Sequence, residues 1–281
     1  MKTHTITVEN FEWYYRETLP KPSSDRQQTI VCLHGIPATG HSWRNLMPPL
    51  AEAGYRCLAP DWLGLGYSDQ PDRRDFKYTP AAYQAALGAW LDALELESVI
   101  LVVQGYLGHV GVLYALENPD RVDRLVILNA PLVSQAKLPW PMQQWGIPLV
   151  GDMLTQDPLL IDRTLEKGSG FIVKEEDLTV YRRPFLKSSS AGRSLMAVIK
   201  NLQLSQATAT IEAGLPKWEK PLHLLWGVAD PWLDSTPISN LIRPHKHMTW
   251  HPFPEAKHYA QEHWSVELAP VLIDELRRTV V

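Results

Sequence analysis

The chain has 281 residues, of which 45% are hydrophobic and 21% are charged, and its formal net charge at pH 7 is -4. This length and composition are typical of a globular protein with a sizeable core. The mildly acidic balance, without a run rich in lysine or arginine, argues against a nucleic-acid or membrane surface, so a small neutral or apolar molecule is the expected partner.

The N-terminal residues and the cysteines bear on the compartment. Residues 1–8 lack the apolar core of a signal peptide, and no apolar run approaches the length that spans a bilayer. We therefore expect a cytoplasmic protein without a transmembrane segment. Only Cys32 and Cys57 are present, each inside an apolar run, which favours buried thiols over a disulfide or a thiolate metal site. We expect neither a metal ion nor a cofactor.

Short apolar runs alternate with longer helical patterns along most of the chain. The first segments, 5–8 and 11–16, alternate polar with apolar residues and predict an antiparallel hairpin around Glu9-Asn10. A helix is expected from the N-cap Thr79, followed by Pro80, to about residue 94. Asn118-Pro119 predicts the end of another helix. Six compact apolar runs predict buried strands: 29–33, 55–59, 99–103, 125–128, 222–226 and 248–253.

This alternation predicts an α/β fold, with a mostly parallel eight-stranded sheet flanked by helices. The alternation of apolar runs and long helical patterns stops between Pro131 and Lys220, where Pro and Gly separate several short helical patterns. We interpret this stretch as an inserted helical cap, residues 135–215. The core domain then consists of residues 1–134 and 216–281.

Candidate site residues follow the predicted strands, where the carboxyl ends of an open parallel sheet meet. His34-Gly35-Ile36-Pro37 follows residues 29–33, and its glycine allows a sharp turn that directs the amide of Ile36 into the site, as an oxyanion hole requires. Asp230 follows residues 222–226, and His258 follows the last strand. The two are placed to form a dyad in which the acid fixes the imidazole tautomer.

In order and spacing, these motifs resemble those of the α/β-hydrolase superfamily, and within it the haloalkane dehalogenase and epoxide hydrolase branch. The loop 61–69 and the sequence His258-Tyr259-Ala260-Gln261-Glu262 are part of this resemblance. The resemblance covers nearly the whole chain. It implies an α/β-hydrolase fold with Asp230 as the acid and His258 as the base. At the position that the family gives to its nucleophile, this chain has Gly105, which has no side chain that could attack a substrate.

The sequence around Gly105 departs from the family at further positions. An alignment shifted by one residue places Tyr106 at the nucleophile position instead, but it moves the downstream helix out of the family's register. The family's halide-binding tryptophan and asparagine correspond to Tyr106 and Ile36. Leu107 stands where the family has glycine, which raises the question whether the turn keeps its shape and directs the amide of Tyr106 into the oxyanion hole.

Without a nucleophile, covalent dehalogenation, epoxide opening and acyl-enzyme hydrolysis are all excluded. The His258-Asp230 dyad can still act as a general base on water or on an acidic C–H or O–H group, with backbone amides stabilising an oxyanion. We therefore predict an atypical α/β-hydrolase-fold protein that acts on a small apolar molecule in a hydrolase-, lyase- or cofactor-free oxygenase-like reaction. The alternative is a catalytically inactive pseudo-hydrolase that binds a small ligand or a protein partner.

The residues expected to line the ligand site come from the turns and from the cap. Gly105, Tyr106 and Ile36 are expected at its floor, beside His258. Aromatic side chains that wall a pocket exclude water and suit apolar ligands. For the tryptophans of the cap, a small core within the cap itself is an equally open interpretation. The tryptophans expected to wall the pocket are Trp62, Trp140, Trp145 and Trp232.

Overall fold

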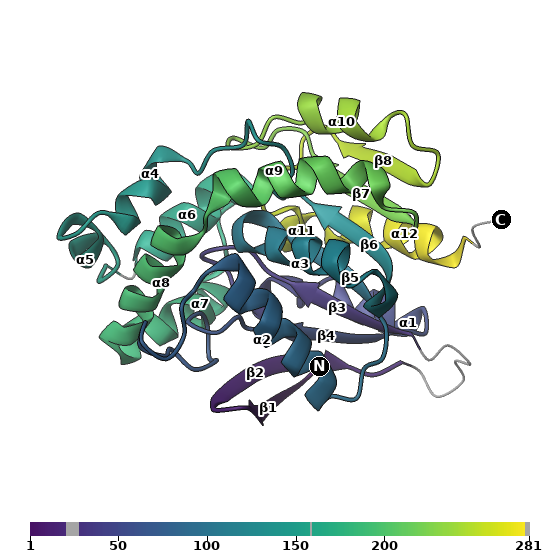
Figure 1. Cartoon of the computed structure of the whole chain (residues 1–281). Helices are drawn as coiled ribbons and strands as arrows, with labels where there is room; N and C mark the ends of the chain where they lie inside the picture. The colour runs from purple at the N-terminus through teal and green to yellow at the C-terminus, as the bar shows by residue number, and fades with distance from the viewer. Residues whose placement is uncertain (21–27, 158, 279–281) are drawn as a thin grey trace.

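The computed structural model describes residues 1–20, 28–157 and 159–278. Within these residues eight strands form one sheet, in the order β1-β2-β4-β3-β5-β6-β7-β8, and helices lie on both of its faces (Figure 1). The predicted α/β fold with a mostly parallel eight-stranded sheet is therefore confirmed. The strands are β1 (Lys2–Val8), β2 (Phe11–Thr18), β3 (Thr29–Leu33), β4 (Arg56–Pro60), β5 (Val99–Gln104), β6 (Val122–Leu128), β7 (Leu222–Gly227) and β8 (Met248–Phe253).

The strands in the middle of the sheet are buried along their whole length. Every residue of β3 and β5 is buried, and Val31 pairs in parallel register with Leu58 of β4 and Leu101 of β5. Such strands have continuous apolar sequences because helices cover both of their faces. β1 and β2 pair antiparallel with each other, and β2 pairs antiparallel with β4, which confirms the predicted hairpin.

Two groups of helices enclose the sheet. α1 and α12 pack on one face, where the buried cluster includes Met47 and Leu272, and α2, α3 and α9 pack on the other with Leu87, Leu113 and Ile211. The helices are α1 (Met47–Glu52), α2 (Pro80–Ala93), α3 (Gly105–Glu117), α4 (Trp140–Gln143), α5 (Val150–Leu154), α6 (Leu159–Ser169), α7 (Glu175–Lys187), α8 (Ser189–Asn201), α9 (Leu204–Gly214), α10 (Thr236–Ile242), α11 (Ala260–His263) and α12 (Ser265–Arg277), with 3₁₀ turns η1 (Gly40–Trp43), η2 (Pro119–Arg121), η3 (Gln144–Gly146) and η4 (Leu215–Lys217).

The predicted helix boundaries agree with the structure to within one residue. The hydroxyl of Thr79 accepts a hydrogen bond from the N–H of Ala82 at 3.3 Å, so Thr79 caps the N-terminus of α2, whose first residue is Pro80. α3 ends directly before Asn118, where the proline that follows cannot continue the helix.

Helices α4 to α8 lie together at one side of the molecule, and α9 leads back from them along α3 (Figure 1). These helices come from the stretch that the sequence marks as a cap. The division into a core of residues 1–134 and 216–281 and a cap of residues 135–215 stays a prediction.

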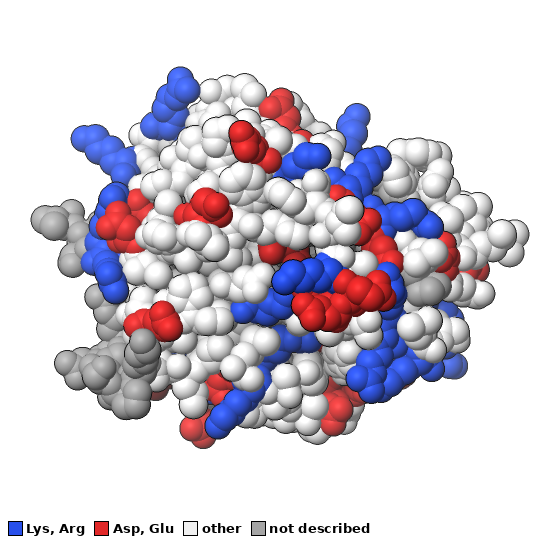
Figure 2. All heavy atoms as spheres, turned by 180° about the vertical axis from the view of Figure 1, so that it is seen from behind, with Lys and Arg blue, Asp and Glu red and all other residues white. Residues whose placement is uncertain are grey.

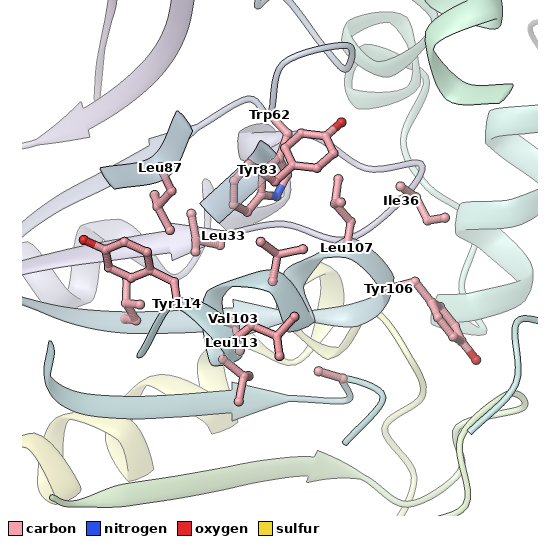
Figure 3. Close-up of a cluster of buried hydrophobic side chains, with 14 of the residues drawn as sticks. Leu33, Ile36, Trp62, Tyr83, Leu87, Val103, Tyr106, Leu107, Leu113 and Tyr114 are labelled. Carbon is pink, nitrogen blue, oxygen red and sulfur yellow. The ribbon is translucent and has the colours of Figure 1, made fainter. Parts of the chain in front are cut away.

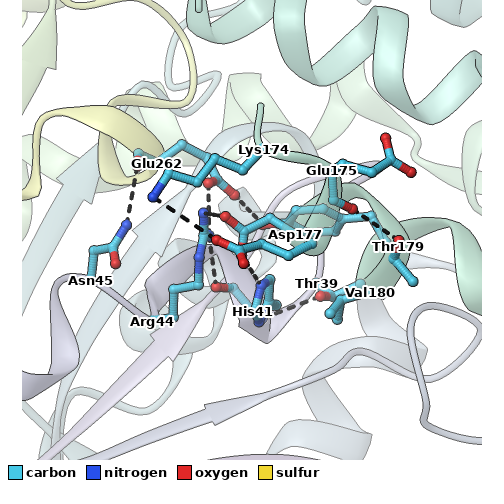
Figure 4. Close-up of polar contacts among 12 residues, drawn as sticks. Thr39, His41, Arg44, Asn45, Lys174, Glu175, Asp177, Thr179, Val180 and Glu262 are labelled. Carbon is cyan, nitrogen blue, oxygen red and sulfur yellow. Dashed lines mark hydrogen bonds and ion pairs between the residues drawn. The ribbon is translucent and has the colours of Figure 1, made fainter. Parts of the chain in front are cut away.

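A buried polar network joins α7 to the segment that contains His41 and Arg44 and to α11 (Figure 4). The guanidinium of Arg44 donates to the carboxylates of Asp177 in α7 and Glu262 in α11, each at 2.7 Å. The Nε2 atom of His41 lies 2.8 Å from the carboxylate of Asp177, and the hydroxyl of Tyr181 donates to Glu262. Burial raises the pKa of Glu262, and Arg44 opposes this shift. The network therefore depends on charges that are largely removed from water.

The surface carries charges of both signs. On the face seen in Figure 2, Lys and Arg side chains are interspersed with Asp and Glu. None of the helices in the described residues is both long and apolar enough to cross a bilayer. Cys32 and Cys57 are buried free thiols, as the sequence predicts.

Candidate active site

Asp230 and His258 meet at the carboxyl end of the sheet, in the turns that follow β7 and β8. The Nδ1–H of His258 donates to Oδ2 of Asp230 at 2.8 Å, and both side chains are fully buried. The other carboxylate oxygen, Oδ1, accepts the backbone N–H groups of Trp232 at 2.8 Å and Leu233 at 3.2 Å. These contacts fix the carboxylate, which in turn fixes the orientation of the imidazole.

Asn129 completes the support of this carboxylate. It follows β6, has a φ of +39° and donates from its side-chain amide to Oδ2 of Asp230 at 2.8 Å and to the carbonyl of Gly227 at 2.9 Å. The N–H of Gly227 returns a hydrogen bond to the Asn129 carbonyl oxygen at 2.8 Å. Asn129 is not among the site residues predicted from the sequence, although it is a polar residue that follows a buried strand, as Asp230 is.

Aromatic rings surround the imidazole of His258. The ring of Tyr106 stacks on it with centroids 5.5 Å apart, and Trp232 and Tyr259 meet it edge-on at 4.7 and 4.9 Å. The Nε2 atom is buried and, among the described residues, has no hydrogen-bond partner. A neutral imidazole whose Nδ1–H is held by a carboxylate presents a lone pair at Nε2, so this atom is available to accept a proton.

Nε2 of His258 faces Gly105, the first residue of α3, which directly follows β5 and has a φ of +69°. A Cβ atom on residue 105 would lie 3.1 Å from this nitrogen and 3.3 Å from the Cα of Gly35. Glycine adopts this φ without the steric cost that other residues incur. A Cβ atom on residue 105 would therefore be crowded by the imidazole and by the Gly35 backbone.

The turn after Gly105 does not continue as a regular helix. Tyr106 has ψ 140° and Leu107 has φ +75°, and the N–H of Ile36 donates to the carbonyl of Tyr106 at 2.9 Å. The N–H of Leu107 donates to Nδ1 of His109 at 3.1 Å. Figure 3 shows the side chain of Leu107 directed toward Trp62 while that of Tyr106 points away from it. The turn is thus reshaped, and the Ile36 amide expected in an oxyanion hole is already hydrogen-bonded.

The structure brings only one of the four predicted tryptophans to the dyad. Trp232 contacts His258, as described. Trp62 is fully buried: its indole N–H donates to the carbonyl of His34 at 2.9 Å, and its ring packs on Tyr83 at 5.4 Å. Trp145 is also buried, whereas 62% of Trp140 is exposed to solvent. Among the described residues, none of these three rings contacts the imidazole.

Burial sets the protonation of the groups around the turn. It lowers the pKa of His34 to about 4, so the ring is neutral at pH 7; its Nε2 accepts the N–H of Trp62 at 3.1 Å, and its Nδ1 lies 2.9 Å from the carbonyl of Gly35. Burial likewise raises the pKa of the Tyr106 hydroxyl, which donates to the carbonyl of Lys137 at 2.7 Å. Tyr106 is therefore a neutral phenol at physiological pH.

The fold, the dyad after β7 and β8 and the turn after β5 together define a protein of the α/β-hydrolase fold. Residues 28–262 match the family described as alpha/beta hydrolase fold, and the chain belongs to that family. Its relatives place it in the branch that resembles the haloalkane dehalogenases.

Two curated relatives illustrate this placement. A haloalkane dehalogenase of Mycolicibacterium paratuberculosis is 32% identical over 257 residues, which cover 85% of this chain and 80% of the relative. A cis-3-alkyl-4-alkyloxetan-2-one decarboxylase of Shewanella oneidensis is 30% identical over 258 residues, which cover 86% and 79%. The crystal structure of a haloalkane dehalogenase from Bradyrhizobium elkani superposes with a TM-score of 0.84 at 23% identity and covers 97% of this chain and 96% of that one, which shows the shared fold.

Proposed function

We propose that Gly105 occupies the nucleophile position of the family and that the protein forms no covalent intermediate with its ligand. The positive φ of Gly105 and the approach of His258 Nε2 to its Cβ position support this assignment. The shifted alignment, which puts Tyr106 at the nucleophile position, has less support. The hydroxyl of Tyr106 is hydrogen-bonded to the carbonyl of Lys137, and only its ring faces the imidazole.

The function that the geometry supports best is general-base chemistry on a small apolar molecule. The observation that carries it is the buried Nε2 of His258, which lacks a partner among the described residues while Nδ1 is held by Asp230. In this proposal Nε2 takes a proton from water or from an acidic C–H or O–H group of the ligand. The carboxylate of Asp230 stabilises the imidazolium that forms.

The ligand would contact Gly105, Tyr106, Ile36 and Trp232, which lie around the dyad. The relatives named above include a dehalogenase and a decarboxylase of an oxetanone, and both names denote reactions of small organic molecules. A hydrolase-, lyase- or cofactor-free oxygenase-like reaction of such a molecule is consistent with this site. The cytoplasmic location expected from the sequence stays a prediction.

The second candidate function is a pseudo-hydrolase that binds a ligand or a protein partner without chemistry. One observation favours it: the Ile36 amide is occupied by the Tyr106 carbonyl, so it offers no donor to an oxyanion. In that case the Asp230–His258 pair would serve to join the turns after β7 and β8.

A turnover screen with matched variants separates the two functions. The wild-type protein is assayed with small haloalkanes, β-lactones, esters and ketones beside His258→Gln, which keeps a polar side chain but cannot act as the base. General-base chemistry predicts turnover that falls by roughly 10² to 10⁴-fold in His258→Gln. Equal turnover by both proteins contradicts this function, and tight ligand binding without turnover by either favours the pseudo-hydrolase.

A further inference from the structure

The peptide group between Tyr106 and Leu107 is turned away from the orientation that a helix requires. Consecutive helical residues have ψ near -42° and φ near -63°, whereas Tyr106 has ψ 140° and Leu107 has φ +75°. Changes of this size at two adjoining dihedral angles rotate the intervening peptide by roughly half a turn. The carbonyl of Tyr106 is therefore turned out of the helical ladder of α3 and accepts the N–H of Ile36.

This rotation changes the partners of two hydrogen-bonding groups. In a helix the carbonyl of Tyr106 would accept from the N–H four residues ahead, and the first N–H groups would point out of the helix toward a ligand. Here the carbonyl accepts the N–H of Ile36 at 2.9 Å, and the N–H of Leu107 donates to Nδ1 of His109 at 3.1 Å. The Ile36 amide, which was expected in the oxyanion hole, and the N–H of Leu107 are therefore both hydrogen-bonded within the protein.

The turned peptide places a leucine in an unfavourable conformation. A side chain with a Cβ atom rarely adopts a positive φ, and such strain persists only where surrounding contacts hold it. The side chain of Leu107 is buried in the main hydrophobic cluster with Trp62 and Tyr83, and its N–H is tied to His109. The hydrogen bonds of Ile36 and His109 are therefore the polar contacts that favour this orientation.

The imidazole of His109 is suited to accept this hydrogen bond. It is fully buried in α3, and burial lowers its pKa to about 4, so the ring is neutral at pH 7 and one nitrogen can accept. His109 is two residues from Leu107 and does not contact Asp230 or His258 among the described residues. It thus affects the site through the backbone rather than by touching a ligand.

We propose that His109 is a positioning residue that determines specificity: its Nδ1 keeps the Tyr106 carbonyl on the Ile36 amide and so removes the Ile36 donor from the oxyanion hole. The proposal rests on the proposed function in one respect, since it takes the space beside His258 to be the ligand site. Substrates whose reaction needs a backbone donor for a developing oxyanion, such as carboxylic esters, are disfavoured. Substrates that need only a base at Nε2 are retained.

Amide hydrogen exchange of the ¹⁵N-labelled full-length protein tests this without any substrate. His109→Phe removes the acceptor and keeps a ring of similar size, whereas His109→Asn keeps an acceptor near the position of Nδ1. His109→Leu is measured beside them in case the phenyl ring prevents folding. We expect the Ile36 amide to exchange at least tenfold faster in His109→Phe or His109→Leu than in the wild type and in His109→Asn. The amide of Val31 in β3 should change little and reports global stability.

Unchanged protection of Ile36 in a folded variant without the acceptor would overturn the role of His109. An increase in the exchange rate of the Ile36 amide that is matched by an equal increase at Val31 would also overturn this role, because both amides would then report lower global stability. Because the readout is exchange, loss of the proposed catalytic function in the screen above leaves this test unaffected. Conversely, an unchanged exchange rate of the Ile36 amide in the variants without the acceptor contradicts the positioning role of His109, even if the protein is an enzyme.

Discussion

The Nε2 atom of His258 faces the α-carbon of Gly105 so closely that a Cβ atom on residue 105 would stand 3.1 Å from it. In the same turn the Tyr106 carbonyl accepts the hydrogen bond of the Ile36 amide. In the function that we propose, His258 is the base, Gly105 offers no side chain for it to activate, and the Ile36 amide is engaged by the Tyr106 carbonyl. Under this proposal the site supports proton transfer and disfavours acyl chemistry.

Restoring a hydroxyl at residue 105 is expected not to restore esterase activity by itself. Gly105→Ser supplies an oxygen near Nε2, but its Cβ is crowded and its φ of +69° is unfavourable for serine, so it should destabilise the protein by about 1–2 kcal/mol. Gly105→Ala is the control for this cost. Hydrolysis of p-nitrophenyl acetate should stay at the Gly105→Ala level in Gly105→Ser and rise in Gly105→Ser/His109→Phe. High activity of the single variant contradicts a closed oxyanion hole.

Removing the amide of Asn129 should weaken both the dyad and the fold. Asn129→Ala leaves the carbonyl and N–H of Gly227 and one oxygen of Asp230 without this partner, so urea unfolding should show a loss of about 1–3 kcal/mol. Asn201→Ala is the control, because within the described part of the chain the Asn201 side chain hydrogen-bonds only to the Ala197 carbonyl in its own helix. A loss no greater than that of the control would show that Asn129 does not support Asp230.

Breaking the buried network around Arg44, which joins α7 to α11, should destabilise the protein more than breaking a surface ion pair. Arg44→Met leaves Glu262 buried without its cation, and unfolding experiments should show a loss of about 3 kcal/mol or more. Arg74→Met, which removes an exposed pair with Asp72, should leave stability almost unchanged. Similar stabilities of the two variants would mean that the buried network does not hold α7 in place.

Acid should destabilise the protein through its buried histidines. Burial lowers the folded-state pKa of His34 and His109 from 6.5 to about 4, so the unfolded chain binds more protons between these values. Their contribution to stability is fully present above pH 6.5 and falls as the pH drops toward 4, by up to roughly 3 kcal/mol for each residue. Urea unfolding at pH 7, 6 and 5 should show this fall in the free energy of unfolding. The free energy should fall less steeply with pH in His109→Asn than in the wild type. An equal slope would contradict the burial of a neutral His109.

The sequence predicts the sheet well because buried parallel strands are continuous apolar runs. Residues 29–33 and 248–253 are predicted with the bounds that the structure shows for β3 and β8. β6 is predicted too short, since the partly exposed Asp123 and Arg124 interrupt its apolar run before residue 125. Asp230 and His258 could be paired because both follow strands that end at the same edge of the sheet.

The reshaped turn lies beyond what a sequence pattern can indicate. The presence of Leu107 raises the question, but the answer depends on a hydrogen bond from Ile36 to Tyr106, two residues that the fold alone brings together. The sequence likewise gives no indication that Trp140 is exposed, because α4, with four residues, is too short to define a buried face. Contacts between distant segments, rather than local preference, decide both features.

Intact-mass spectrometry during turnover tests the central claim most directly. Wild type and His258→Gln are incubated with each substrate identified in the screen, and with haloalkanes and activated esters, and the protein mass is recorded over time. The account predicts that the wild type converts its substrate while its mass stays that of the unmodified chain, and that His258→Gln converts the substrate far more slowly and also gains no mass. A mass increase equal to an alkyl or acyl fragment of the substrate, in either protein, would reveal a covalent intermediate and contradict the account.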